Sequence, residues 1–77
     1  MRAAIAQIVI KEYGSGVRYE GQVSQRGKWH GKGVYSRSDG GRYVGEFQNY
    51  CYHGHGTYTH ANGGVESGKW ENDNFLG

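Results

Sequence analysis

Apolar and small residues alternate with polar residues in short segments spread along the chain. Tyr19, Gly21 and Val23 form one such series, Tyr43, Gly45 and Phe47 a second, and Glu66, Gly68 and Trp70 a third. Residues two apart in a β-strand lie on the same face of the sheet. The residues between them point to the other face: Glu20, Gln22, Val44, Glu46, Ser67 and Lys69. The alternation therefore predicts β-strands with one packed face.

A second type of segment follows each of the first two, and it repeats at a fixed interval. Gly31, Gly33 and Tyr35 recur as Gly54, Gly56 and Tyr58, 23 positions later. These segments end at Asp39-Gly40-Gly41 and Asn62-Gly63-Gly64, which favour tight turns because their residues tolerate positive φ. A period of this length indicates a repeat protein. The predicted fold is all-β, a single twisted antiparallel meander of stacked β-hairpins.

The glycine at the centre of each first-strand series, Gly21, Gly45 or Gly68, is expected to make room for a ring. Glycine weakens a strand, so its regular position beside aromatic residues needs a physical reason. Without a side chain there, a neighbouring aromatic ring can lie flat against the backbone.

Residues 1–17 differ from the repeats and are predicted to form a lead-in that caps the array. Ile8, Val9 and Ile10 favour a strand, and Gly14-Ser15-Gly16 favours a turn, which together predict a first hairpin over residues 8–23. The first ten residues weakly resemble a signal peptide or an organelle presequence, without an obvious cleavage site. Organelle import therefore stays open beside an intracellular location.

Two further features bear on location. Cys51 is the single cysteine and cannot form an internal disulfide, which favours a reducing, cytoplasmic compartment. No apolar run approaches the roughly 20 residues that a membrane-spanning helix needs.

The repeated segments resemble the MORN repeat (membrane occupation and recognition nexus). Tyr43-Val-Gly-Glu-Phe, His53-Gly-His-Gly-Thr-Tyr and Asn62-Gly match one repeat; Tyr19-Glu-Gly, His30-Gly-Lys-Gly-Val-Tyr and Asp39-Gly match another. The resemblance implies an array over residues 18–77, with repeats at about 19–41 and 43–64 and a partial copy at 65–77. It also implies a non-catalytic protein-binding module at cytoskeletal, ciliary or membrane-associated structures.

The sequence departs from this pattern at several positions. Val23 stands where the family usually has an aromatic residue, Tyr50 replaces a turn glycine, and Glu66 replaces the strand tyrosine. Leu76-Gly77 stands where His-Gly is expected. The partial third repeat is therefore predicted to lack its second strand.

The favoured function is a scaffold or structural subunit of a larger assembly, without enzymatic activity. Its partner would be another protein chain or a second copy of this one. An open sheet offers two ends for such contacts, here residues 8–10 and 70–76. The expected partner-binding groove is lined by aromatic residues on the packed face: Tyr19, Tyr35, Tyr43, Phe47, Tyr58 and Trp70.

The charge distribution suggests an alternative function. Residues 18–42 are predominantly basic and residues 43–77 predominantly acidic, although the net charge is only +2. Four basic residues lie among aromatic ones and predict a patch for anionic phospholipid headgroups: Arg18, Lys28, Lys32 and Arg42. Nucleic acid is disfavoured because the net charge is small for a phosphate backbone.

Metal binding and catalysis receive little support. Cys51, His53 and His55 alternate along one strand, and Asp73 or His60 would have to complete a zinc site. The competing interpretation has His53 bonded to backbone and Cys51 as a small packed residue. Histidines in successive repeats, about 9.5 Å apart, are too far apart to share an ion. No catalytic constellation or phosphate loop is present, so neither a metal nor a cofactor is predicted.

Overall fold

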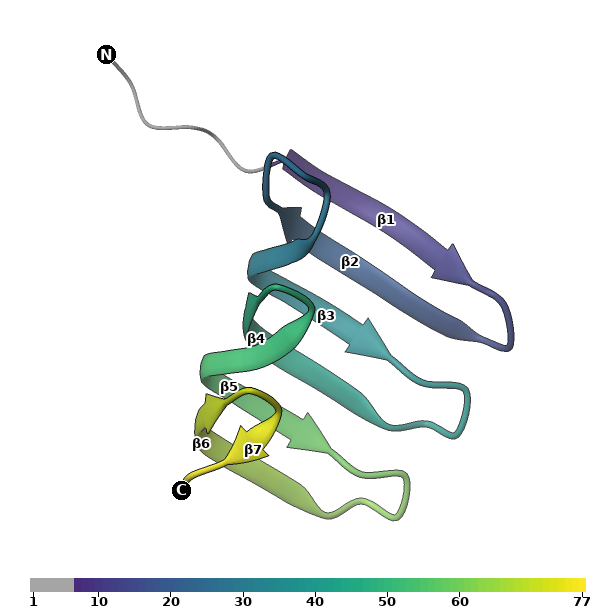
Figure 1. The fold of residues 1–77 in the computed structure, drawn as a ribbon. Coiled ribbons are helices and arrows are strands. Elements are labelled where there is room, and N and C mark those ends of the chain that lie inside the picture. The colour runs from purple at the N-terminus through teal and green to yellow at the C-terminus, as the bar shows by residue number, and fades with distance from the viewer. Residues whose placement is uncertain (1–6) are drawn as a thin grey trace.

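The computed structural model describes residues 7–77, which form one antiparallel sheet and no helix (Figure 1). The strands follow each other across the sheet in chain order. They are β1 (Gln7–Tyr13), β2 (Val17–Val23), β3 (Trp29–Ser36), β4 (Arg42–Gln48), β5 (Cys51–Thr59), β6 (Val65–Glu71) and β7 (Asn74–Phe75). The predicted all-β meander of hairpins is confirmed. The presequence-like residues 1–6 lie outside the described residues.

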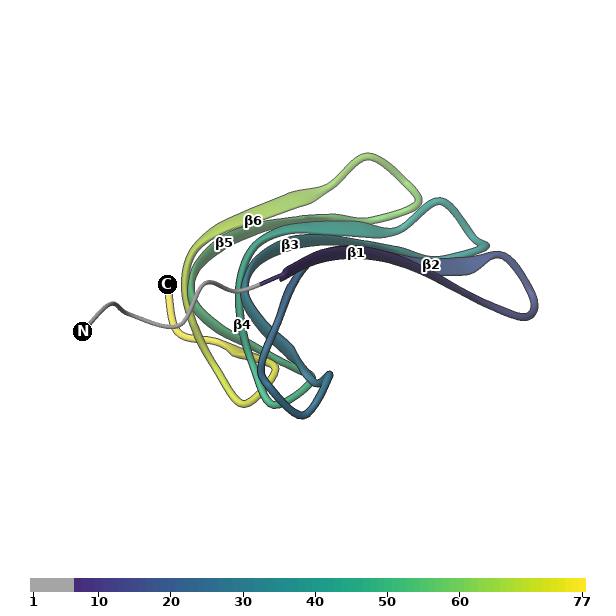
Figure 2. The same ribbon diagram turned by 90° about the horizontal axis from the view of Figure 1, so that it is seen from above.

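The central glycines form a row across the sheet. Gly21 pairs with Gly33, Gly33 with Gly45, Gly45 with Gly56, and Gly56 with Gly68. The register shifts directly after Gly21 and after Gly45, and such bulges bend a strand and increase its twist. Figure 2 shows the result: the strands follow a common curved path, so the sheet is strongly bent.

The turns have the conformations that their residues favour. Gly14–Gly16 joins β1 to β2, and Ser15 and Gly16 have φ of 69° and 80°. Between β4 and β5, Asn49 and Tyr50 both have positive φ, as a type I′ turn requires. In the long turns, the Asp39 and Asn62 side chains each accept a hydrogen bond from the backbone N–H two residues later. The predicted turns at residues 14–16, 39–41 and 62–64 are confirmed.

The prediction that the third repeat lacks its second strand needs correction. The short strand β7 pairs with β6 through Trp70 opposite Phe75 and Glu71 opposite Asn74. Its cause is the turn at Asn72 and Asp73, which has the same positive φ values as the turn 23 residues earlier. This two-residue turn brings the following residues into hydrogen-bonding register.

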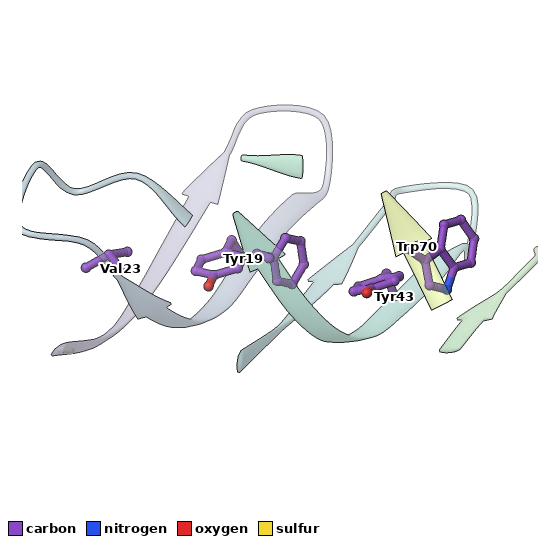
Figure 3. Packing of buried hydrophobic residues seen from close by; sticks show 5 residues of the cluster. Tyr19, Val23, Tyr43 and Trp70 are labelled. Atoms are coloured by element: carbon purple, nitrogen blue, oxygen red, sulfur yellow. The ribbon is translucent and has the colours of Figure 1, made fainter. Parts of the chain in front are cut away.

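The buried core lies on one face of the sheet, which we call the inner face. It consists of five side chains from β2, β4 and β6, four of them labelled in Figure 3: Tyr19, Val23, Tyr43, Phe47 and Trp70. All five occupy the alternating positions that the sequence pattern assigned to the packed face. Tyr19 and Tyr43 are completely buried, although only a single sheet is present.

Candidate functional site

Each completely buried tyrosine lies over a glycine of the next strand. A Cβ atom at Gly33 would come within 2.6–2.8 Å of the ring and hydroxyl of Tyr19, and one at Gly56 would approach Tyr43 even more closely. Real Cβ atoms do not make contacts this short, so only glycine fits. Room for a ring was predicted for the first-strand glycines Gly21, Gly45 and Gly68. A Cβ at Gly21 or Gly45 would instead meet the backbone of the next strand first and a tyrosine hydroxyl only afterwards, at 2.9 and 3.0 Å.

The tyrosine hydroxyls are fixed by the bulges of their own strands. Tyr43 donates to the carbonyl of Glu46 at 2.9 Å, and Tyr19 donates to the carbonyl of Gln22. Burial raises the pKa of both phenols to about 12, because an ionised oxygen would lose its water there. The bulge side chains also support the next strand: Gln22 accepts from the N–H of Lys32, and Glu46 from that of His55, each at 2.7 Å.

A second layer of rings covers the buried tyrosines. Trp29 is stacked on Tyr19, with ring centroids 4.7 Å apart and planes within 4° of parallel. Tyr52 is stacked on Tyr43 in the same way, at 4.0 Å and 6°. Trp29 and Tyr52 are only half-buried, so each exposes part of a ring that is held in place from below.

The half-buried and exposed rings form a continuous surface, which we call the aromatic face. Neighbouring centroids lie 5.8 Å apart for Tyr13 and Trp29, 5.1 Å for Trp29 and Tyr35, 6.3 Å for Tyr35 and Tyr52, and 5.9 Å for Tyr52 and Tyr58. These contacts link rings from β1, β3 and β5. The aromatic face consists of Tyr13, Trp29, Tyr35, Tyr50, Tyr52 and Tyr58, and of Phe75, which is joined to it through the buried Trp70.

The structure divides the predicted groove residues into two sets. Tyr35 and Tyr58 are on the aromatic face, half-buried and packed against the core. The other four are core residues covered by the chain itself: Tyr19, Tyr43, Phe47 and Trp70. They support the aromatic face from below.

Sequence reasoning missed five rings of the aromatic face: Tyr13, Trp29, Tyr50, Tyr52 and Phe75. For Trp29, Tyr52 and Phe75 a signal was present, since these aromatic residues recur at intervals of 23 residues. They lie at the start of β3 and in β5 and β7, outside the Gly-x-Gly-x-Tyr segments that defined the second strands.

The two ends of the aromatic face carry opposite charge. At one end, Lys11 lies opposite Tyr19 in the β1–β2 register. At the other end, Glu66 lies opposite Tyr58, and the Asp73 carboxylate accepts a hydrogen bond from the N–H of Tyr52 at 2.8 Å. Lys11 therefore lies at the end beside β1, and Glu66 and Asp73 lie at the end beside β6 and β7, where the Glu66 carboxylate is 3.1 Å from Nε2 of His60.

Three of the four residues of the predicted lipid patch lie on the opposite side of the sheet, which we call the outer face. Arg18 and Arg42 are both paired with Ser36, and Lys32 is paired with Glu46. Lys28 lies instead in the turn between β2 and β3. Around these cations the outer face has a shallow, open hollow lined in part by Ile8, Val34, Val44, Lys32 and Arg42.

The candidate zinc residues do not form a cluster. Within residues 7–77, no group of three or more histidine, cysteine or acidic side chains is close enough to hold a metal ion. Burial and the nearby Asp73 carboxylate raise the pKa of the Cys51 thiol, which disfavours the thiolate that a metal requires. Among residues 7–77, the buried Nδ1 of His53 has no hydrogen-bond partner, which differs from the expected backbone bond.

The described residues contain no helix that is long and apolar enough to cross a bilayer. Their fold is that of a β-hairpin repeat protein. A row of central glycines crosses the sheet, and the aromatic rings pack in two layers on its inner face. The family model of the MORN repeat matches residues 19–42 and 43–65, more than half of the chain, and the protein belongs to this family. Among curated proteins no relative matches the chain. MORN repeats are generally non-catalytic modules that mediate protein or membrane interactions.

Proposed function

We propose that the protein is a non-catalytic interaction scaffold that binds a segment of a partner protein on the aromatic face. The observation that carries this proposal is the stacking of Trp29 on Tyr19 and of Tyr52 on Tyr43. Each exposed ring lies on a buried ring whose hydroxyl is bonded to backbone. Rigid aromatic side chains on a pre-organised support are typical of binding hot spots, because little conformational entropy is lost on binding.

A peptide-display selection against the folded chain tests this proposal. We expect enriched peptides to lose binding when Tyr35 or Tyr58 is replaced by serine. They should bind normally to Val34→Ser and Val44→Ser, which change the outer face. Peptides that depend on the valines but not on the tyrosines would overturn the proposal. Circular dichroism of each variant separates a lost contact from a lost fold.

The ends of the sheet are the second contact surface of the proposed scaffold. Among the described residues, β1 is paired on one side only, and its Ile8 and Ile10 are 67% and 57% exposed. An unprotected edge of this kind can add a strand from a neighbouring subunit or a second copy. The test is sedimentation velocity of the protein against Ile10→Lys, in which a charge blocks the edge. Loss of self-association in the variant supports this role.

A membrane-association function is the alternative, and the outer face favours it. Arg18, Lys32 and Arg42 share this face with exposed Val44 and with Ile10. Cations near an anionic bilayer contribute about 1 kcal/mol each. Co-sedimentation with phosphatidylserine vesicles should therefore decrease with added salt and in the double variant Arg18→Gln, Arg42→Gln. Either function would place the protein at an intracellular cytoskeletal or membrane-associated structure.

A further inference from the structure

We propose that the partner segment is a proline-rich peptide in the polyproline II conformation, with one turn of the peptide per hairpin repeat. The inference rests on the proposed function, because it names the ligand of the aromatic face. The peptide would lie across the strands, over Trp29 and Tyr35 of one repeat and then over Tyr52 and Tyr58 of the next.

The spacing of the rings matches this conformation. Trp29 and Tyr52 are equivalent residues of successive hairpins, as are Tyr35 and Tyr58. Equivalent positions are two strands apart, which is about 9.5 Å in a sheet. A polyproline II helix advances about 3.1 Å per residue with three residues per turn, or about 9.3 Å per turn. Prolines at every third position would therefore meet one ring pair each.

An extended strand does not have this period. Its side chains return to the same face after two residues, about 6.7 Å, which falls between the ring pairs.

The backbone of the sheet also favours a polyproline II ligand over an extended strand. Under the aromatic face the strands β2 to β6 are hydrogen-bonded to neighbours on both sides, so they offer a ligand few free backbone groups. Polyproline II needs none, since its backbone stays solvated and docks on aromatic side chains.

The charges at the two ends specify the residues that flank the prolines. The end beside β1 has Lys11, and the end beside β6 and β7 has Asp73 and Glu66, whose carboxylate is 3.1 Å from Nε2 of His60. A ligand with acidic residues at one end and basic residues at the other complements both, whereas a ligand with the same charge at both ends is repelled at one of them. The partner segment is therefore proline-rich, with opposite charges at its two ends.

The two tryptophans provide a built-in readout. The indole N–H of Trp29 donates to the Tyr13 hydroxyl on the aromatic face at 3.0 Å, while that of buried Trp70 donates to the Gly56 carbonyl at 3.0 Å. The probe is a synthetic peptide with three prolines at every third position, two aspartates at one end and two lysines at the other. In an NMR titration, we expect the Trp29 indole signal to shift and the Trp70 signal to stay nearly constant.

Calorimetry with matched peptides and variants then tests each part of the proposal. Moving the prolines off the three-residue period, or giving both ends the same charge, should weaken binding. Tyr58→Ser and Tyr35→Ser should each weaken binding at least about five-fold, the effect of truncating one favourable interface residue. Lys11→Glu should weaken binding of the peptide with opposite charges at its two ends and strengthen binding of a peptide with lysines at both ends. Val44→Ser on the outer face is the matched control.

Two results would overturn the inference. One is equal binding of the periodic and the rearranged peptides, and the other is the absence of a Trp29 shift at saturating peptide. If display selection still yields peptides that depend on Tyr35 and Tyr58 but lack the proline period, the proposed function stands and only the polyproline ligand fails. If no peptide depends on these tyrosines, the proposed function itself fails.

Discussion

The ring of Tyr19 lies so close to Gly33 that a Cβ atom on this glycine would be 2.7 Å from Cε1 of the tyrosine. Tyr43 and Gly56 repeat the relationship in the next hairpin. In both, the tyrosine comes from the first strand of a repeat and the glycine from the second. This contact lets a single sheet bury a ring completely, because the ring lies against backbone on one side and under a stacked ring on the other.

Replacing Gly33 by alanine should therefore destabilise the fold. An added methyl group has no space under Tyr19, and overpacking of this kind typically costs about 1–3 kcal/mol. The matched control is Gly14→Ala, because a Cβ at Gly14 meets nothing within 4 Å. Urea unfolding should show a lower midpoint for Gly33→Ala and little change for Gly14→Ala. Equal stability of the two variants would contradict the packing described here.

Tyr43→Phe should isolate the contribution of the buried hydroxyl. The variant keeps the ring but removes the 2.9 Å hydrogen bond to the Glu46 carbonyl, so we expect a loss of about 0.5–1.5 kcal/mol in the free energy of unfolding. Tyr58→Phe is the control, since the Tyr58 hydroxyl makes no hydrogen bond within residues 7–77 in this structure. A similar loss in both variants would show that the bulge bond has no special role.

The stability should fall at alkaline pH because burial raises the pKa of the Tyr19, Tyr43 and Tyr52 phenols. For Tyr19 and Tyr43 the pKa is about 12 in the folded protein, against about 10 in an unfolded chain. Below pH 10 both states keep these protons, and the contribution of burial is fully present. As the pH rises from 10 to 12, only the unfolded state releases them, so unfolding becomes progressively more favourable.

Denaturant unfolding at a series of pH values measures this effect, with phenolate absorbance reporting the ionisation. Tyr43→Phe should show a smaller loss between pH 10 and 12, because one of the three phenols whose pKa is raised by burial is gone. Ionisation of every tyrosine near pH 10 without a loss of stability would contradict the prediction.

Glu46 is expected to act through hydrogen bonding and not through its charge. Its carboxylate accepts from the N–H of His55 at 2.7 Å, and the neutral Gln22 does the same for Lys32 in the previous repeat. Glu46→Gln should therefore leave the urea midpoint nearly unchanged, whereas Glu46→Ala should cost about 0.5–1.5 kcal/mol. A loss in Glu46→Gln as large as in Glu46→Ala would show that the charge matters.

The candidate site was only partly predictable from sequence. Tyr35 and Tyr58 were assigned to the partner surface, and the structure places both on the aromatic face. Alternation identifies which residues share a face, but it does not show which of them are covered. Trp29 covers Tyr19 because the bulge after Gly21 shifts the register of β2 and β3. The alternation of residues within one strand gives no information about this shift in register between two strands.

The sequence by itself determined the strands, the turns and the row of glycines beside the rings. These features are local, since they follow from the two-residue period, from positive φ at the turns and from the 23-residue repeat. Only the tertiary structure decided which rings are buried and which are exposed, and that β7 exists. The physical reason is that burial depends on how much the sheet bends and on which ring stacks on which. Both are set by bulges and by contacts between strands, where residues distant in sequence come together.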